Sequence, residues 1–78
     1  MQNTTTRKTF EEIMQEYKNL ESDSFRQMIR NIAAMSLKES GFQEIGSSDV
    51  NCEIVGLYNS YEGFDGIVRH GLDLVRSH

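Results

Sequence analysis

The feature that most constrains this chain is a stretch in which apolar side chains recur at helical spacing between a capping signal and a glycine. The apolar positions are Phe25, Met28, Ile29, Ile32, Ala33 and Leu37. Ser24 can accept hydrogen bonds from the free N–H groups of a helix start, and Gln27 can reach back to complete a capping box. Gly41 readily adopts the left-handed conformation just past a helix end. This pattern predicts a helix over 25–40.

A second capping box lies nearer the start of the chain, in the run Thr9-Phe10-Glu11-Glu12. Thr9 can cap the free N–H groups, and Glu12 can reach back to the capping residue. Apolar side chains follow at helical spacing, at Phe10, Ile13, Met14, Tyr17 and Leu20. These signals predict a helix over 10–21.

A loop over 41–48 precedes a third predicted helix, over 49–61, with Ser48 or Asp49 as its cap. One face of that helix would carry Val50, Ile54, Leu57, Tyr58 and Tyr61. A strand over 52–58 is the alternative, but it would be a lone strand with no partner for its backbone groups. The helix is therefore the preferred prediction.

A fourth helix is predicted over 66–77, after Gly63 and with Asp65 as its cap. Four apolar residues are expected to point inward, namely Ile67, Val68, Leu72 and Val75. Gly71 lies inside this helix and costs about 1 kcal/mol relative to alanine, so another backbone is expected to pack closely there.

With 78 residues, the chain is long enough for one domain and hides only about 60% of the surface that its unfolded form exposes. We expect a flexible tail over 1–8 and a single helical domain over 9–78. The predicted fold is all-α, a small helix-turn-helix-like bundle of about four helices.

Cys52 is the only cysteine, so no internal disulfide can form. A reducing compartment fits this best, and the polar start of the chain lacks the apolar core of a secretory signal. We therefore expect a cytoplasmic protein with no membrane association.

Two motifs in the second helix and beyond resemble the DNA-binding domain of tetracycline-repressor-type (TetR) regulators. The first is Ile29-Arg-Asn-Ile-Ala33-Ala-Met-Ser-Leu37-Lys-Glu-Ser-Gly41-Phe42, and the second is Gly56-Leu57-Tyr58-Asn59-Ser60-Tyr61-Glu62-Gly63-Phe64-Asp65-Gly66-Ile67-Val68. The resemblance covers 26–75 and implies a helix-turn-helix module in which Tyr58 contacts a phosphate.

The chain departs from the TetR pattern in three respects. The stretch between the two motifs is several residues shorter than is usual in the family, and Phe64 stands where the family typically has a phosphate-contacting lysine. In addition, an extra helix precedes the module and no ligand-binding domain is expected to follow it. DNA binding is therefore expected to be possible but weak.

Polar residues around the third helix are the candidates for contact with DNA or another partner. They are Ser47, Ser48, Asn51, Tyr58, Asn59 and Tyr61. Hydroxyls and amides at a helix start can touch a phosphate backbone, although such residues more often serve as caps. Aromatic residues at helical spacing more often pack at the edge of a core.

Charge is unevenly distributed, because the first 40 residues are balanced and the second half holds the whole net charge of −4. An acidic surface opposes DNA binding and favours a basic protein partner. The candidates for such a docking surface are Glu44, Glu53, Glu62, Asp65 and Asp73.

Self-association is also expected, because the first helix carries large apolar residues that need a cover. The candidates for an oligomer contact are Phe10, Met14 and Tyr17. Their helix would either fold back on the second helix or pack across a homodimer.

The sequence contains no pattern that indicates catalysis, a cofactor or a metal site. His70 and His78 lack metal-ligand spacing, and the paired acids of the first helix are explained by its dipole.

Two classes of function stay open. The preferred one is a regulator of transcription that acts on DNA or on another regulator through its TetR-like module. The other is an acidic inhibitor, antitoxin or immunity-type protein that docks on a basic site.

Overall fold

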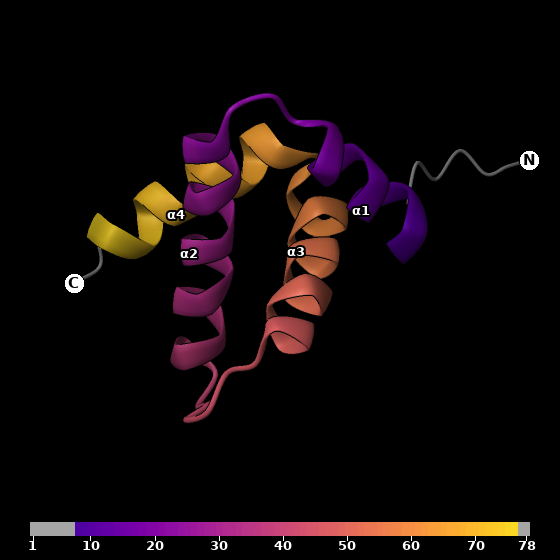
Figure 1. The fold of residues 1–78 in the computed structure, drawn as a ribbon. Helices are drawn as coiled ribbons and strands as arrows, with labels where there is room; N and C mark the ends of the chain where they lie inside the picture. Colours follow the sequence, from indigo (N-terminus) through magenta and orange to yellow (C-terminus); the bar gives the residue numbers. More distant parts are fainter. Residues whose placement is uncertain (1–7, 77–78) are drawn as a thin grey trace, which may run out of the picture.

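The computed structural model of this protein describes residues 8–76, which form four helices in sequence order (Figure 1). They are α1 (Phe10–Asn19), α2 (Asp23–Glu39), α3 (Ser47–Tyr61) and α4 (Phe64–Arg76). Residues 8–76 contain no strand, so the segment 52–58 is helical. The prediction of a small all-α bundle is confirmed.

Helix α1 begins as the sequence predicts. The Thr9 side chain accepts from the backbone N–H of Glu12 at 3.2 Å, and the Glu12 carboxylate accepts from the backbone N–H of Thr9 at 2.9 Å. The capping box is therefore confirmed. The helix ends at Asn19 rather than at residue 21, because Leu20 takes an extended conformation.

Helix α2 begins earlier than predicted. Ser22 is its N-cap, and the Ser22 hydroxyl accepts from the backbone N–H of Phe25 at 3.1 Å. The prediction of Ser24 as the cap was wrong, since Ser24 lies inside the first turn. At the other end, Gly41 has φ +102°, the left-handed conformation expected just past the helix.

Helix α3 also begins earlier than predicted, at Ser47. Its N-cap is Gly46, whose backbone N–H donates to the Asp49 carboxylate at 3.0 Å. The prediction of Ser48 or Asp49 as the cap was therefore wrong. Asp49 still holds the helix start, but from inside the first turn.

The turn between α3 and α4 consists of Glu62 and Gly63, which both have positive φ. The left-handed conformation costs a residue with a side chain about 1 kcal/mol. Glu62 adopts it as the C-cap of α3, where its backbone N–H donates to the Tyr58 carbonyl. Helix α4 begins at Phe64, and Asp65 lies in its first turn instead of capping it as predicted.

Helices α2 and α3 run antiparallel and are joined at one end by residues 40–46 (Figure 1). Helix α4 crosses this pair near the opposite end, and α1 lies against α3. The core that they enclose is entirely apolar, with Ile13, Met14, Ile29, Ile32, Ala33, Leu37, Val50, Ile54, Leu57 and Ile67 buried.

Two glycines allow α4 to pack closely against the end of α3 and against α2. A Cβ on Gly66 would lie 1.6 Å from the Tyr61 carbonyl oxygen, and a Cβ on Gly71 would lie 2.5 Å from Cδ1 of Ile32. The sequence predicted that another backbone packs closely against Gly71. The close neighbour is instead the buried side chain of Ile32.

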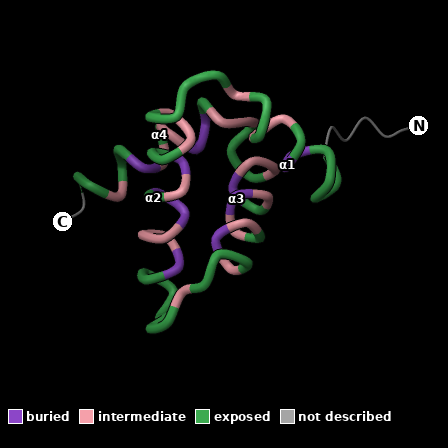
Figure 2. Tube along the Cα trace, in the orientation of Figure 1, coloured by how far each residue is buried: buried purple, intermediate pink, exposed green. Residues whose placement is uncertain are grey.

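The C-terminal half of α4 departs from the predicted inward face. Leu72 is 56% exposed and Val75 is 61% exposed, whereas Ile67 is fully buried. The inward face of this half is carried by Leu74, which packs against the core, whereas Leu72 and Val75 lie on another side of the helix. Exposed and partly buried residues alternate along this half of α4 (Figure 2). Among the helices of residues 8–76, none is long and apolar enough to cross a membrane.

Candidate functional site

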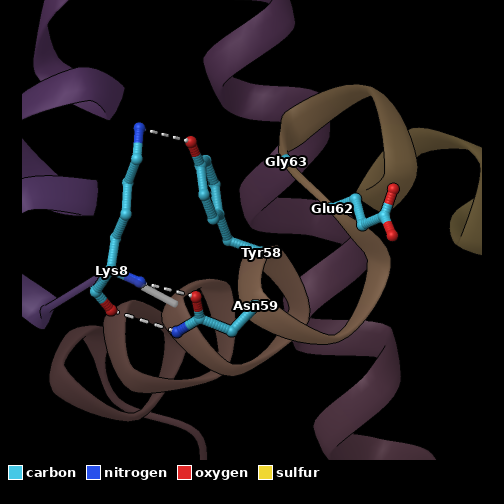
Figure 3. Close-up of a pocket in the computed structure, with 5 residues that line it drawn as sticks. All are labelled: Lys8, Tyr58, Asn59, Glu62 and Gly63. Atoms are coloured by element: carbon cyan, nitrogen blue, oxygen red, sulfur yellow. Dashed lines mark hydrogen bonds between the residues drawn. The ribbon is translucent and has the colours of Figure 1, made fainter. Parts of the chain in front are cut away.

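A hollow of about 250 Å³ opens where the residue before α1 meets the C-terminal end of α3 (Figure 3). Its lining residues are Lys8, Tyr58, Asn59, Glu62 and Gly63. Three of these residues were candidates from the sequence, drawn from two different sets. The fold thus brings a predicted DNA-contacting tyrosine next to a predicted acidic docking residue.

An aromatic cluster positions the Tyr58 ring at this hollow. Tyr58 meets Phe64 edge-on, with ring centroids 4.9 Å apart, and Phe64 also packs against Tyr17 at 6.3 Å. Edge-to-face contacts of this kind are favourable between aromatic rings. Phe64, which stands at the position of the TetR lysine, therefore joins α1, α3 and α4 through apolar contacts.

A polar network holds Lys8 against α3. The Lys8 backbone N–H donates to Asn59 Oδ1 at 3.0 Å, and Asn59 Nδ2 donates to the Lys8 carbonyl at 3.2 Å. The Lys8 ammonium donates to the Tyr58 hydroxyl at 3.2 Å and forms an ion pair with Glu16. The Tyr58 hydroxyl in turn donates to Glu16 at 2.8 Å. The rest of the predicted tail, residues 1–7, lies outside the described residues.

The network shifts the protonation equilibria of its two charged members. Its hydrogen bonds to Glu16 and then to Tyr58 raise the pKa of Lys8 well above the ordinary value of 10.5. The hydrogen bonds from Lys8 and Tyr58 lower the pKa of Glu16 below its ordinary value. Both groups therefore stay charged across the neutral range.

A second, more open hollow of about 440 Å³ adjoins the first, because both are lined by Lys8. The second hollow is lined by Lys8, Glu11, Glu12, Gln15, Glu16 and Asn19. Together the two hollows, which we call the Lys8 surface, carry the carboxylates of Glu11, Glu12, Glu16 and Glu62. Among residues 8–76, Lys8 is the only basic residue in the lining of this surface.

The other candidates for DNA contact lie apart from the Lys8 surface. At the start of α3, the Arg30 guanidinium donates to Asn51 at 2.8 Å and to the Ser47 hydroxyl at 3.2 Å. Ser48 is exposed on α3. Tyr61 stacks on His70 with ring centroids 4.3 Å apart. The candidate polar set is thus divided between the two ends of α3, and most of its members have partners within the chain.

The acidic candidates do not form one surface either. Glu44 lies in the connection 40–46, while Glu62 and Asp65 lie at the turn beyond the other end of α3. A helix of this length spans about 22 Å, which separates the two groups. Glu53 accepts a hydrogen bond from the Ser36 hydroxyl at 2.6 Å, and Asp73 lies in the C-terminal half of α4. Of this set, only Glu62 lines the Lys8 surface.

The residues proposed for an oligomer contact mostly make contacts within the chain itself. Met14 is buried, and the Tyr17 hydroxyl donates to the Arg26 carbonyl at 3.1 Å. Phe10 is 44% exposed. Helix α1 therefore has its cover mainly from α3, not from α2 as we considered.

Sequence reasoning missed the residues that organise both ends of α3, namely Lys8, Glu16 and Arg30. Their partners are far away in the sequence, since Asn59 lies 51 positions after Lys8 and Tyr58 lies 42 positions after Glu16. No local pattern signals such pairs. The odd placement of a basic residue directly before the Thr9 capping box is the only hint that the sequence offers.

The arrangement is suited to binding charged groups at a surface. In residues 8–76, no three His, Cys, Asp or Glu side chains gather as a metal site would require, and Cys52 is exposed. The exposed carboxylates of the Lys8 surface can accept hydrogen bonds from guanidinium or ammonium groups. No protein-family model, no curated protein and no solved structure matches this chain.

Proposed function

We propose that this protein acts by binding, without catalysis, and that it docks its Lys8 surface on a basic site of a partner protein. An inhibitor, an antitoxin or an immunity-type protein would act in this way. The observation that carries the proposal is the composition of the two adjoining hollows, which among residues 8–76 are lined by four carboxylates and one ammonium group.

The state of each carboxylate supports this proposal. Glu16 is already paired with Lys8, whereas Glu11 and Glu62 are exposed at the two margins of the surface. A partner arginine could bind such a carboxylate through two parallel hydrogen bonds. Charge at the rim of an interface mainly raises the association rate and selects the partner.

An NMR titration with an oligo-arginine peptide tests this proposal. We expect salt-sensitive shifts of the Glu11, Gln15 and Glu62 resonances, because these residues line the Lys8 surface. The double variant Glu11→Gln/Glu62→Gln should bind about tenfold more weakly, a loss of about 1.4 kcal/mol.

The double variant Glu21→Gln/Glu44→Gln is the matched control. It changes the net charge by the same amount, and neither residue lines a hollow. We expect its affinity for the peptide to stay within about twofold of the wild type. Equal losses for both double variants would indicate bulk charge and would refute a defined docking surface.

A second candidate function is regulation of transcription through the TetR-like module over 26–75. One observation favours it, because the fold brings the basic residues Lys8 and Arg30 beside α3. Against it, α3 itself contains no lysine or arginine. Phosphate neutralisation supplies most non-specific affinity for DNA, so we expect weak binding to duplex DNA.

A titration of genomic DNA fragments at low and near-physiological salt separates the two functions. Tight, salt-sensitive binding to one fragment that is lost in Tyr58→Ala or Asn59→Ala would favour the regulator. These two substitutions also disturb the contacts with Lys8, so Ser48→Ala, on the exposed side of α3, is the additional variant. Absence of DNA binding at both salt concentrations would favour the docking protein.

A further inference from the structure

The C-terminal half of α4 carries large apolar side chains that are exposed at the surface of the bundle. Leu72 and Val75 are both more than half exposed, and Val68, which is partly buried against the core, lies one turn earlier on the same side. Beside Val75 there is a hollow of about 310 Å³ between α4 and α2, which is lined by Met35, Lys38, Glu39, Leu74 and Val75. In Figure 1 this part of α4 extends beyond α2, away from the bundle.

A row of alternating charges flanks this apolar surface. Asp65, Arg69, Asp73 and Arg76 follow one another at helical spacing and lie along one side of α4, next to Leu72. Along the helix the order is acid, base, acid, base, and in the reverse direction it is base, acid, base, acid. Two copies that run in opposite directions therefore bring acids next to bases. The row is thus complementary to itself when it is reversed.

We propose that this protein forms a two-fold dimer in which α4 packs antiparallel on α4 of a second copy, along Val68, Leu72 and Val75. In antiparallel packing the charged side of one helix faces the same side of the other. Asp73 then lies opposite Arg69 of the partner subunit, and Asp65 lies opposite Arg76 of the partner subunit. In a parallel two-fold pair the two charged sides would lie on opposite flanks of the interface, so these charges would not meet.

This reversed complementarity identifies the occupant as a second copy of the chain. An isologous interface needs a patch that fits itself, and the charges of α4 meet that requirement. A helix of 13 residues is about 20 Å long. Such an interface is smaller than the ~800 Å² per partner of a standard complex, so the dimer should be weak.

Sedimentation velocity from about 10 μM to about 500 μM tests the proposal, since weak association is expected for so small an interface. The 9.0 kDa chain should shift from monomer towards dimer across this range. Leu72→Asp/Val75→Asp should remain monomeric throughout. Phe10→Ser should dimerise like the wild type, because Phe10 lies on α1.

Charge exchange between two variants tests the antiparallel arrangement. Arg69→Glu alone should weaken the dimer severalfold, because it sets an acid opposite Asp73, and Asp73→Arg alone should weaken it by setting two bases together. A mixture of the two variants should recover dimerisation. In the mixed dimer the new acid at position 69 lies opposite the new base at position 73, and the native Asp73 lies opposite the native Arg69. Recovery in the mixture also excludes a loss of fold as the cause of the single effects.

Three results would overturn the proposal. The first is a wild-type protein that stays monomeric at the highest concentration. The second is a dimer that survives Leu72→Asp/Val75→Asp but is lost in Phe10→Ser. The third is a mixture of charge variants that dimerises no better than either variant alone.

Discussion

The two halves of helix α4 show how differently the same pattern can be used. In the first half, Ile67 is fully buried and Gly66 lies against the α3 backbone. In the second half, Leu74 packs against the core, whereas Leu72 and Val75 lie on another side of the helix and are exposed. Apolar residues at helical spacing indicate that a helix needs a cover, while the position of the neighbouring helices decides which of these residues are covered.

The largest expected effect comes from a matched pair of substitutions in α4. Ile67→Ala should lower the free energy of unfolding by about 2–5 kcal/mol, because it leaves a cavity in the core. Leu72→Ala should lower it by less than about 1 kcal/mol, since the side chain is mostly in water. Urea denaturation at low micromolar concentration measures both in the monomer, and equal losses would contradict the division of α4.

Glycine substitutions extend the comparison to the backbone. Gly66→Ala should destabilise the fold by about 1–3 kcal/mol, because the new methyl group would collide with the Tyr61 carbonyl. Gly56→Ala on the exposed side of α3 is the control, since nothing lies within 4 Å of the added atom. It should instead stabilise the fold by about 1 kcal/mol through helix propensity. Thermal unfolding followed by circular dichroism would reveal opposite shifts of the melting temperature.

A smaller effect is expected at the contact between α1 and α3. Tyr58→Phe keeps the ring against Phe64 but removes the hydrogen bond to Glu16. The loss should be about 0.5–1.5 kcal/mol in the free energy of unfolding. Tyr61→Phe, at an exposed ring, should change it by less than about 0.5 kcal/mol in the same assay. An unchanged stability in Tyr58→Phe would show that the network contributes nothing net.

The smallest effect concerns the pH dependence of Glu16. Its pKa is lower in the folded chain than the ordinary 4.5, so its contribution is present above that value and is lost as the pH falls through the folded pKa. The difference in stability between the wild type and Glu16→Gln should therefore be constant from neutral pH to about pH 5 and should shrink in more acidic solution. A difference that grows on acidification would contradict the direction of this shift.

The sequence by itself determined the helices of this protein and much of its core. The periodicity around Ile29 and Ile54 required a buried face, and the Thr9 capping box fixed the start of α1, because these signals act within one or two turns of the chain. The exact start of a helix was harder to predict where several neighbouring residues could serve as its cap. At Ser22 and Gly46 the true caps lie two or three residues before the predicted ones.

Only the tertiary structure decided which surfaces these helices share. The pairing of Lys8 with Asn59 and of Arg30 with Asn51 depends on how helices distant in the sequence cross, and no local pattern encodes that geometry. The same holds for Leu72, since whether a stripe is covered depends on the position of another helix. Local chemistry therefore set the elements, while the packing of α1 and α4 on the central pair decided which side chains are left for a partner.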